Sequence, residues 1–364
     1  MSLKALISIA LLSSTLTHAQ EPDQHQMAVQ LGWLYLKPMS NNHTYAYYVA
    51  GTQPIFQDWH AQAVNPAYAS AFELGLQYNF KETPFSAAVD WIHLSSSDSA
   101  SVQGNQTLNL ANIAFVAPPF EMSPPVFGIR HAAAQLNYTY DNVTTNLEKI
   151  IDVSGFMKAK VVGGLNILRL KQSISTTFSD FVGTLATDYS YALPPDPSFS
   201  FKIQSISEFM GVGPDLGLTG QLDIFKGLSI VGAAFGSLNV GITSVQENFT
   251  STSAELTRSG VGVSQQQVTT PNKTQVVPGF DGKLGLLYQF SGHHLSNLSL
   301  EGGYRVITYM NAISTTNPQT LVQPGTYIIT PEFSTGTMAI VSMDQQDRPF
   351  NLNGPYLTLK VNFM

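Results

Sequence analysis

The sequence predicts an all-β fold: a single transmembrane antiparallel up-and-down β-barrel of about ten strands, with short periplasmic turns and long extracellular loops. Three observations support this prediction. Segments of about ten residues alternate apolar and polar side chains, the period of a strand with one apolar face. Short turns and long polar stretches alternate between these segments. No apolar run beyond the N-terminus approaches the ~20 residues that a membrane-spanning helix needs.

The composition fits a membrane barrel and argues against several other classes. Charged residues make up 11% of the chain, whereas soluble domains contain about 25%. The net charge of −7 and the lack of a basic patch argue against a nucleic-acid partner. The chain contains 0 cysteines, so its stability has to come from backbone pairing or a large core.

The N-terminus has the pattern of a secretory signal. Lys4 precedes an apolar run at 5–12, and a polar stretch then ends at Ala19. A small residue at this position is typical of a cleavage site. We therefore expect a signal peptide at 1–19, a barrel at 20–364, and export to the outer membrane, where lipid and lipopolysaccharide surround the protein.

Ten segments carry the alternation, at about 27–36, 70–80, 85–91, 132–140, 157–167, 212–222, 228–240, 280–290, 298–306 and 357–363. The barrel would have twelve strands if the segment 172–182 or the segment 326–341 adds strand pairs. In the fourth segment, Ala134, Leu136 and Tyr138 are assigned to the outward, lipid-facing side. Pro214 removes a ladder hydrogen bond and predicts a bulge in the sixth segment.

Short turns are expected at 81–83, about 150–154, 223–227 and 291–295, with long loops near 38–67, 95–127, 171–207, 243–277 and 312–353. A soluble β-sandwich would share the strand alternation. Alternating connection lengths and an even strand number favour the barrel instead.

The charges inside these segments all have the parity opposite to the apolar face. A Lys or Arg facing lipid at the bilayer midplane costs about 2–4 kcal/mol. Ten residues are therefore candidate pore-lining residues: Glu73, Asp90, Lys158, Lys160, Asp215, Asp281, Lys283, Glu301, Arg305 and Lys360.

Several stretches carry a family resemblance: DGKLGLLYQF (281–290), LSLEGGYRVITYMNAI (298–313), GVGPDLGL (211–218), GLSIVGAAFGSL (227–238), GPYLTLKVNF (354–363), LGWLYLKP (31–38) and FELGLQYNF (72–80). In order and spacing the chain resembles the Legionella major outer membrane protein family of pore-forming barrels. The resemblance implies a porin-like pore, often with a role at the host-contact surface. Members of this kind can be cross-linked through cysteines, which this chain lacks.

Five acids and five bases in the lumen favour passive diffusion of small hydrophilic solutes through a mixed-charge pore. The alternative is a surface adhesin or structural barrel with a largely plugged lumen, whose long loops contact host or phage ligands. A barrel of ten strands is close in size to the barrels of about eight strands whose interior is filled by side chains, rather than to those of 16–18 strands that leave an open channel. Some space in the lumen is expected at the small inward residues, which are Gly75, Gly217, Gly285, Gly303, Ala71 and Ala88.

Other chemistry finds little support in the sequence, so no catalytic, cofactor or metal site is expected and the protein is not predicted to be an enzyme. His293 and His294 are adjacent, and neighbours on a strand point to opposite faces. No Gly-x-Ser-x-Gly nucleophile motif occurs.

The C-terminal strand, in which Phe363 is the next-to-last residue, predicts that the barrel assembly machinery recognises the protein. If the protein forms a homo-oligomer, we expect the oligomer to form without disulfides.

Overall fold

The computed structural model describes residues 26–52, 55–105, 113–119, 122–123, 129–154, 156–181, 196–252, 264–290, 298–324 and 336–363. The expected signal peptide at 1–19, Met364 and the pair His293–His294 lie outside the described residues. Every regular element in the described ranges is a β-strand. No helix in these ranges is long and apolar enough to cross a membrane.

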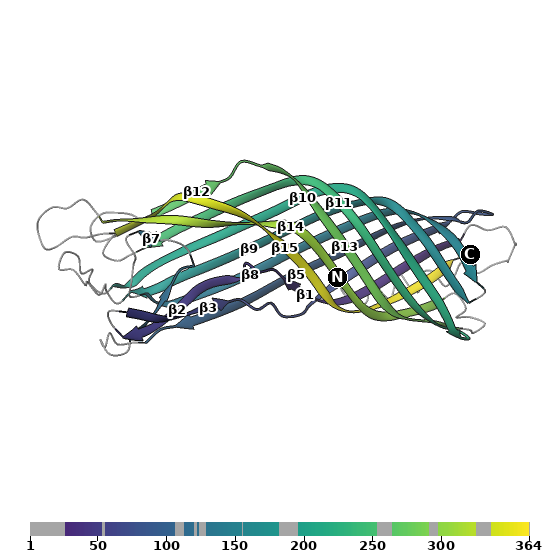
Figure 1. The fold of residues 1–364 in the computed structure, drawn as a ribbon, viewed down its shortest axis with the longest axis horizontal. Coiled ribbons are helices and arrows are strands. Elements are labelled where there is room, and N and C mark those ends of the chain that lie inside the picture. The colour runs from purple at the N-terminus through teal and green to yellow at the C-terminus, as the bar shows by residue number, and fades with distance from the viewer. Residues whose placement is uncertain are drawn as a thin grey trace, which may run out of the picture.

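Ten strands form the barrel wall: β1 (Gln26–Met39), β4 (Ala69–Asn79), β5 (Phe85–Gln103), β8 (Ile129–Ser154), β9 (Met157–Phe181), β10 (Asp196–Phe225), β11 (Leu228–Thr252), β13 (Lys273–Gln289), β14 (Leu298–Pro324) and β15 (Gly336–Phe363). Each pairs antiparallel with the next in this order, and β15 pairs with β1 to close the ring. Figure 1 shows the strands tilted around one elongated barrel.

Five shorter strands lie near the end of the barrel opposite the C-terminus (Figure 1). They are β2 (Thr44–Thr52), β3 (Ile55–Ala63), β6 (Ile113–Ala117), β7 (Met122–Ser123) and β12 (Ser264–Thr269). β2 pairs with β3 and β6 in a separate sheet, β12 extends the edge of β11, and β7 pairs with β14. The stretches expected as long loops therefore contain strands of their own.

All ten expected segments lie in the ten wall strands, so the predicted barrel and its strand number are confirmed. The strands are longer than expected, because residues assigned to loops at 171–181 and 196–207 belong to β9 and β10. The bulge predicted at Pro214 is wrong. The register of β10 with β11 is the same at Val212↔Val240 and Asp215↔Ser237, on either side of the proline.

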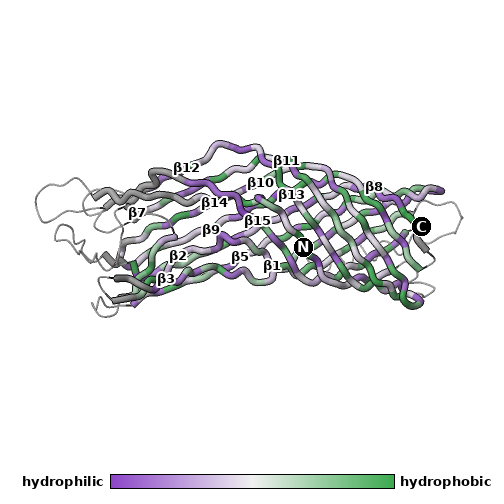
Figure 2. Tube along the Cα trace, viewed as in Figure 1, coloured by the Kyte–Doolittle hydropathy of each residue, from purple (hydrophilic) through white to green (hydrophobic). Residues whose placement is uncertain are grey.

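The outward face carries an apolar belt at the end of the barrel where the C-terminus and the short turns lie. Leu216, Leu218 and Leu284 are 68%, 60% and 65% exposed on this face. Figure 2 shows hydrophobic and hydrophilic residues alternating along the strands of this part. Exposed leucines at this density fit contact with acyl chains rather than with water.

Beyond the belt, the apolar residues point inward instead. Ala134, Leu136 and Tyr138 are 4%, 0% and 1% exposed and belong to a hydrophobic core inside the barrel. Their assignment to the lipid-facing side is therefore wrong. The reason is physical: past the bilayer the outer wall meets water, so apolar side chains are buried by packing across the lumen.

Candidate functional site

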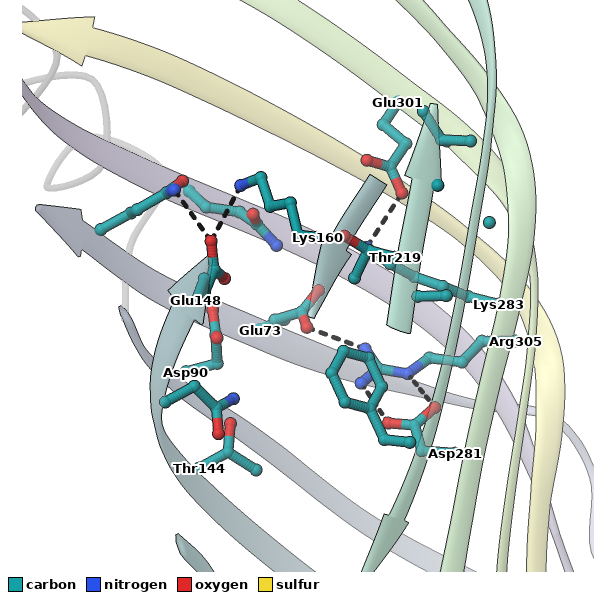
Figure 3. Close-up of a pocket in the computed structure, with 18 of the residues that line it drawn as sticks. Glu73, Asp90, Thr144, Glu148, Lys160, Thr219, Asp281, Lys283, Glu301 and Arg305 are labelled. Atoms are coloured by element: carbon teal, nitrogen blue, oxygen red, sulfur yellow. Dashed lines mark hydrogen bonds and ion pairs between the residues drawn. The ribbon is translucent and has the colours of Figure 1, made fainter. Parts of the chain in front are cut away.

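The ten candidate pore-lining residues line one cavity of about 410 Å³ inside the barrel, here called the lower cavity. They come from β4, β5, β9, β10, β13, β14 and β15, and all lie on inward positions of strands whose outward positions form the apolar belt. Their place inside the barrel wall is observed, whereas their role as the lining of a pore stays a prediction. Figure 3 shows side chains from opposing walls meeting in this cavity.

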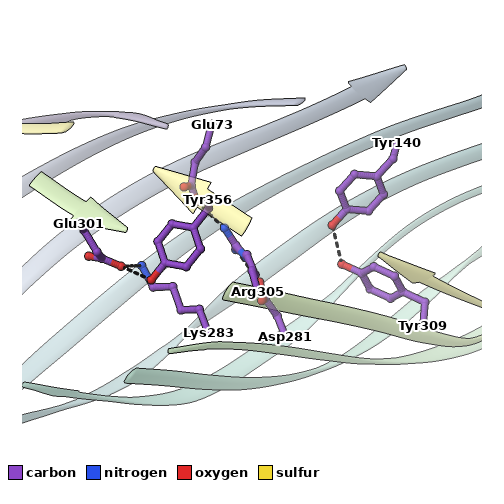
Figure 4. A network of polar contacts seen from close by, with 8 residues as sticks. All are labelled: Glu73, Tyr140, Asp281, Lys283, Glu301, Arg305, Tyr309 and Tyr356. Atoms are coloured by element: carbon purple, nitrogen blue, oxygen red, sulfur yellow. Dashed lines mark hydrogen bonds and ion pairs between the residues drawn. The ribbon is translucent and has the colours of Figure 1, made fainter. Parts of the chain in front are cut away.

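Arg305 lies at the centre of the charged network. Its guanidinium donates from Nε and Nη2 to the two oxygens of Asp281 at 2.9 and 2.6 Å, and from Nη1 to Glu73 at 2.8 Å (Figures 3 and 4). Planar guanidinium geometry suits this bidentate contact. Arg305 and Glu73 are 9% and 5% exposed as side chains. Deleting one member of such a buried set costs about 3–5 kcal/mol, because it leaves an unpaired charge.

A second cluster lies beside the first. Lys283 donates to Glu301 at 3.0 Å, and the Tyr356 hydroxyl donates to the same carboxylate oxygen at 2.7 Å (Figure 4). The Lys283 ammonium also lies 5.6 Å from the centroid of the Tyr356 ring. These contacts fix both charges against one wall of the barrel.

The third cluster includes an acid that the sequence reasoning missed. Lys160 donates to Glu148 at 2.8 Å, and Ser86 and Gln77 donate to the same oxygen at 2.9 and 3.1 Å. Lys360 contacts Gln77 at 2.6 Å. A signal for Glu148 was available: it has the parity opposite to Leu147, which is 61% exposed outward.

The remaining candidates are not paired. Within the described ranges, Asp90, Asp215 and Lys158 line the lower cavity without an ion pair. The cavity is therefore mixed in character: neutralised clusters occupy part of its wall, and single charges face the remaining space. Among the described residues, no group of three or more potential ligand side chains is placed to hold a metal ion.

Two of the inward glycines, Gly217 and Gly285, do not open the lumen as expected. Gly285 pairs with Gly303 across β13 and β14, and a Cβ on Gly285 would lie 2.6 Å from the Tyr356 hydroxyl. A Cβ on Gly217 would lie 2.2 Å from the Phe235 ring. Gly217 and Gly285 make room for aromatic side chains that fold over them, so the space that these two glycines provide is already occupied.

A layer of apolar and aromatic side chains forms the roof of the lower cavity. We call it the apolar barrier; all its members are at most 3% exposed, and they are Tyr138, Tyr140, Phe209, Ile307, Tyr309, Phe350 and Leu352. The hydroxyls of Tyr140 and Tyr309 lie 3.2 Å apart (Figure 4). β8 and β14, which carry them, stand on opposite walls of the ring. Side chains therefore meet across the whole diameter of the barrel.

Among solved structures, the chain is similar to the outer membrane protease OmpT of Escherichia coli, with 11% identity, a TM-score of 0.42 and coverage of 96% of this chain and 100% of that one. It is also similar to a Pseudomonas aeruginosa FadL homologue, with 9% identity, a TM-score of 0.27 and coverage of 93% and 90%. No curated protein matches the chain.

The family comparison is more specific. The protein-family model described as Legionella pneumophila major outer membrane protein precursor matches residues 20–363 of this chain. The match covers both the belt and the barrier, and the fold it implies is the one observed. The chain therefore belongs to the Legionella major outer membrane protein family and is located in the outer membrane.

Proposed function

We propose that the protein is a surface barrel whose lumen is closed at rest and whose projecting end contacts ligands outside the cell. The observation that carries this proposal is the contact between Tyr140 and Tyr309 across the diameter of the barrel. Water and ions pass a hydrophobic constriction only when it is wide enough to stay hydrated. The seven side chains of the apolar barrier are at most 3% exposed, which favours a lumen that is closed at this level.

The length of the strands supports the second half of the proposal. A tilted strand crosses a bilayer in about 9–11 residues, whereas β10 has 30 residues and β15 has 28. More than half of each strand therefore extends past the membrane, and β2, β3, β6 and β12 add to this end. We infer that this extension presents a surface for host or phage ligands.

Passive diffusion of small hydrophilic solutes is the second candidate function. The lower cavity favours it, because six acids, with Glu148 among them, and five bases surround a volume of about 410 Å³ inside the membrane belt. Opposed charges across a wet lumen orient dipolar solutes. For this function the apolar barrier has to part, so we expect it to act as the gate of any channel.

Conductance in planar bilayers separates the two candidates. We expect the refolded wild type to give no single-channel steps, and a Tyr140→Ala/Tyr309→Ala/Phe350→Ala variant to give discrete steps, because the barrier is thinned. The matched control is Tyr288→Ala/Tyr304→Ala, which removes two aromatic rings that are 46% and 47% exposed on the outer face. Steps from the wild type would overturn the closed barrel and support passive diffusion.

A further inference from the structure

A second cavity, here called the upper cavity, lies above the apolar barrier on the side away from the short turns. Its volume is about 330 Å³, close to the lower limit for sites that hold small molecules. Five of its lining residues carry the argument that follows: Tyr45, Phe178, Glu247, Thr316 and Arg348. The charged clusters of the lower cavity take no part in it.

Glu247 is the acidic residue of this cavity, and it is fully buried at 0% exposure. One of its carboxylate oxygens accepts a hydrogen bond from the Thr316 hydroxyl. The other, Oε2, has no hydrogen-bond partner in the described part of the chain. A buried carboxylate oxygen without a donor is energetically unfavourable, so the site as it stands is incomplete.

Arg348 is the basic residue of the same cavity, and it is not paired with Glu247. Its guanidinium donates to the side-chain oxygen of Gln346, while Nε has no partner in the described residues. Within those residues no carboxylate forms an ion pair with it. The cavity therefore contains one acid and one base that each lack a charged partner.

Aromatic side chains line the space around these charges. Tyr45 is 2% exposed, and the Phe178 ring stacks on Phe201 with centroids 4.6 Å apart and an angle of 13°. Rigid stacked rings offer a flat apolar wall at low cost in conformational entropy. A ligand that fits all these features has a positive group, a negative group and an apolar body.

We propose that the upper cavity binds a small zwitterion of the α-amino-acid class. Its ammonium group donates to Oε2 of Glu247, its carboxylate accepts from the Arg348 guanidinium, and its side chain packs against Tyr45 and Phe178. A ligand with only a positive group would leave Arg348 without a partner. A ligand with only a negative group would lie against the carboxylate of Glu247, which has the same sign of charge. The proposal goes beyond the proposed function and holds whether or not the barrel conducts.

Titration calorimetry on the full-length protein in detergent tests this site with three related probes. Phenylalanine carries both charges, phenethylamine lacks the carboxylate, and 3-phenylpropionate lacks the ammonium. We expect phenylalanine to bind about 10- to 100-fold more tightly than either analogue, as the loss of one charge-assisted hydrogen bond predicts. No binding of phenylalanine, or equal binding of all three probes, would overturn the proposal.

Two variants assign each charge to its partner. Glu247→Gln is expected to bind phenylalanine and 3-phenylpropionate equally, and Arg348→Gln is expected to bind phenylalanine and phenethylamine equally. The control variants are Glu208→Gln and Arg169→Gln, since these residues pair with each other at 2.9 Å on the outer wall. A loss of phenylalanine binding in the controls that equals the loss in the cavity variants would contradict the site.

Discussion

At the scale of single residues, burial changes the protonation of Glu247. The residue lies beyond the membrane belt, and desolvation by burial raises its pKa from the usual 4.5 to about 7. The hydrogen bond from the Thr316 hydroxyl lowers the pKa and offsets the shift only in part. Arg348 is the charged residue that shares its cavity. Near neutral pH a large share of the molecules therefore keeps this carboxyl protonated.

This raised pKa predicts a pH-dependent stability. A group with a higher pKa in the folded state stabilises the fold fully below its unfolded pKa, and that stability is lost as the pH rises through the folded pKa. Between pH 4.5 and about 7 the wild type should therefore lose up to about 3 kcal/mol through Glu247. Urea unfolding in detergent micelles measures this loss. Glu247→Gln should remove it, and parallel pH profiles for the two proteins would contradict the assignment.

At the scale of the element, the inner and outer faces of one strand have different tolerance for side-chain volume. On β14, Gly302 faces outward and Gly303 faces inward. A Cβ on Gly303 would lie 2.2 Å from the Leu284 carbonyl oxygen, whereas the nearest atom to a Cβ on Gly302 would be Leu357 Cδ1, at 3.4 Å. The lumen side is crowded because it is the concave side of the wall.

Two alanine substitutions test this difference in one strand. Gly303→Ala should destabilise the barrel by about 1–3 kcal/mol, because backbone atoms cannot move aside as a flexible side chain can. Gly302→Ala should be close to neutral, since it adds a methyl group at ordinary contact distance on the lipid side. Chemical unfolding followed by tryptophan fluorescence compares them. Equal losses of stability would show that the inner face is not the crowded one.

The elements also show which part of the barrel could be predicted from the sequence. Leu216, Leu284 and Leu357 lie outward, and the charges of opposite parity lie inward, as predicted. Alternation reports that a strand has two unlike faces, but not which face is buried. In β8 the inward side is apolar at Leu136 and polar at Asn146. The sequence pattern does not indicate at which residue of a strand the membrane-spanning part ends.

At the scale of the whole molecule, closure of the ring was predictable, whereas the side-chain contact across the lumen was not. The C-terminal strand pairs with the first, with Phe363 opposite Met27 and Leu359 opposite Leu31, as an even-numbered barrel requires. The contact of Tyr140 with Tyr309 joins strands far apart in sequence and on opposite walls. Such a contact depends on barrel diameter and strand tilt, which strand alternation does not determine.

The charges of the lower cavity predict the selectivity of a barrel whose barrier has been thinned. Lys158 and Lys160 both line this cavity, and Lys160 pairs with Glu148 at 2.8 Å. Replacing both lysines by Glu in the Tyr140→Ala/Tyr309→Ala/Phe350→Ala background changes their summed charge from about +2 to about −2. A more negative lumen attracts cations and repels anions, so the reversal potential in a KCl gradient should shift toward that of K⁺.

The control for this shift places the same charge change on the outer wall. Lys171 is 39% exposed as a side chain and pairs with Glu208 on that wall, and Lys202 is exposed one strand away on β10. Lys171→Glu/Lys202→Glu should leave the reversal potential nearly unchanged, because solvent ions screen charges more than about 10 Å from the conducting path. An equal shift from both pairs would mean that the lumen charges do not face the path that ions take.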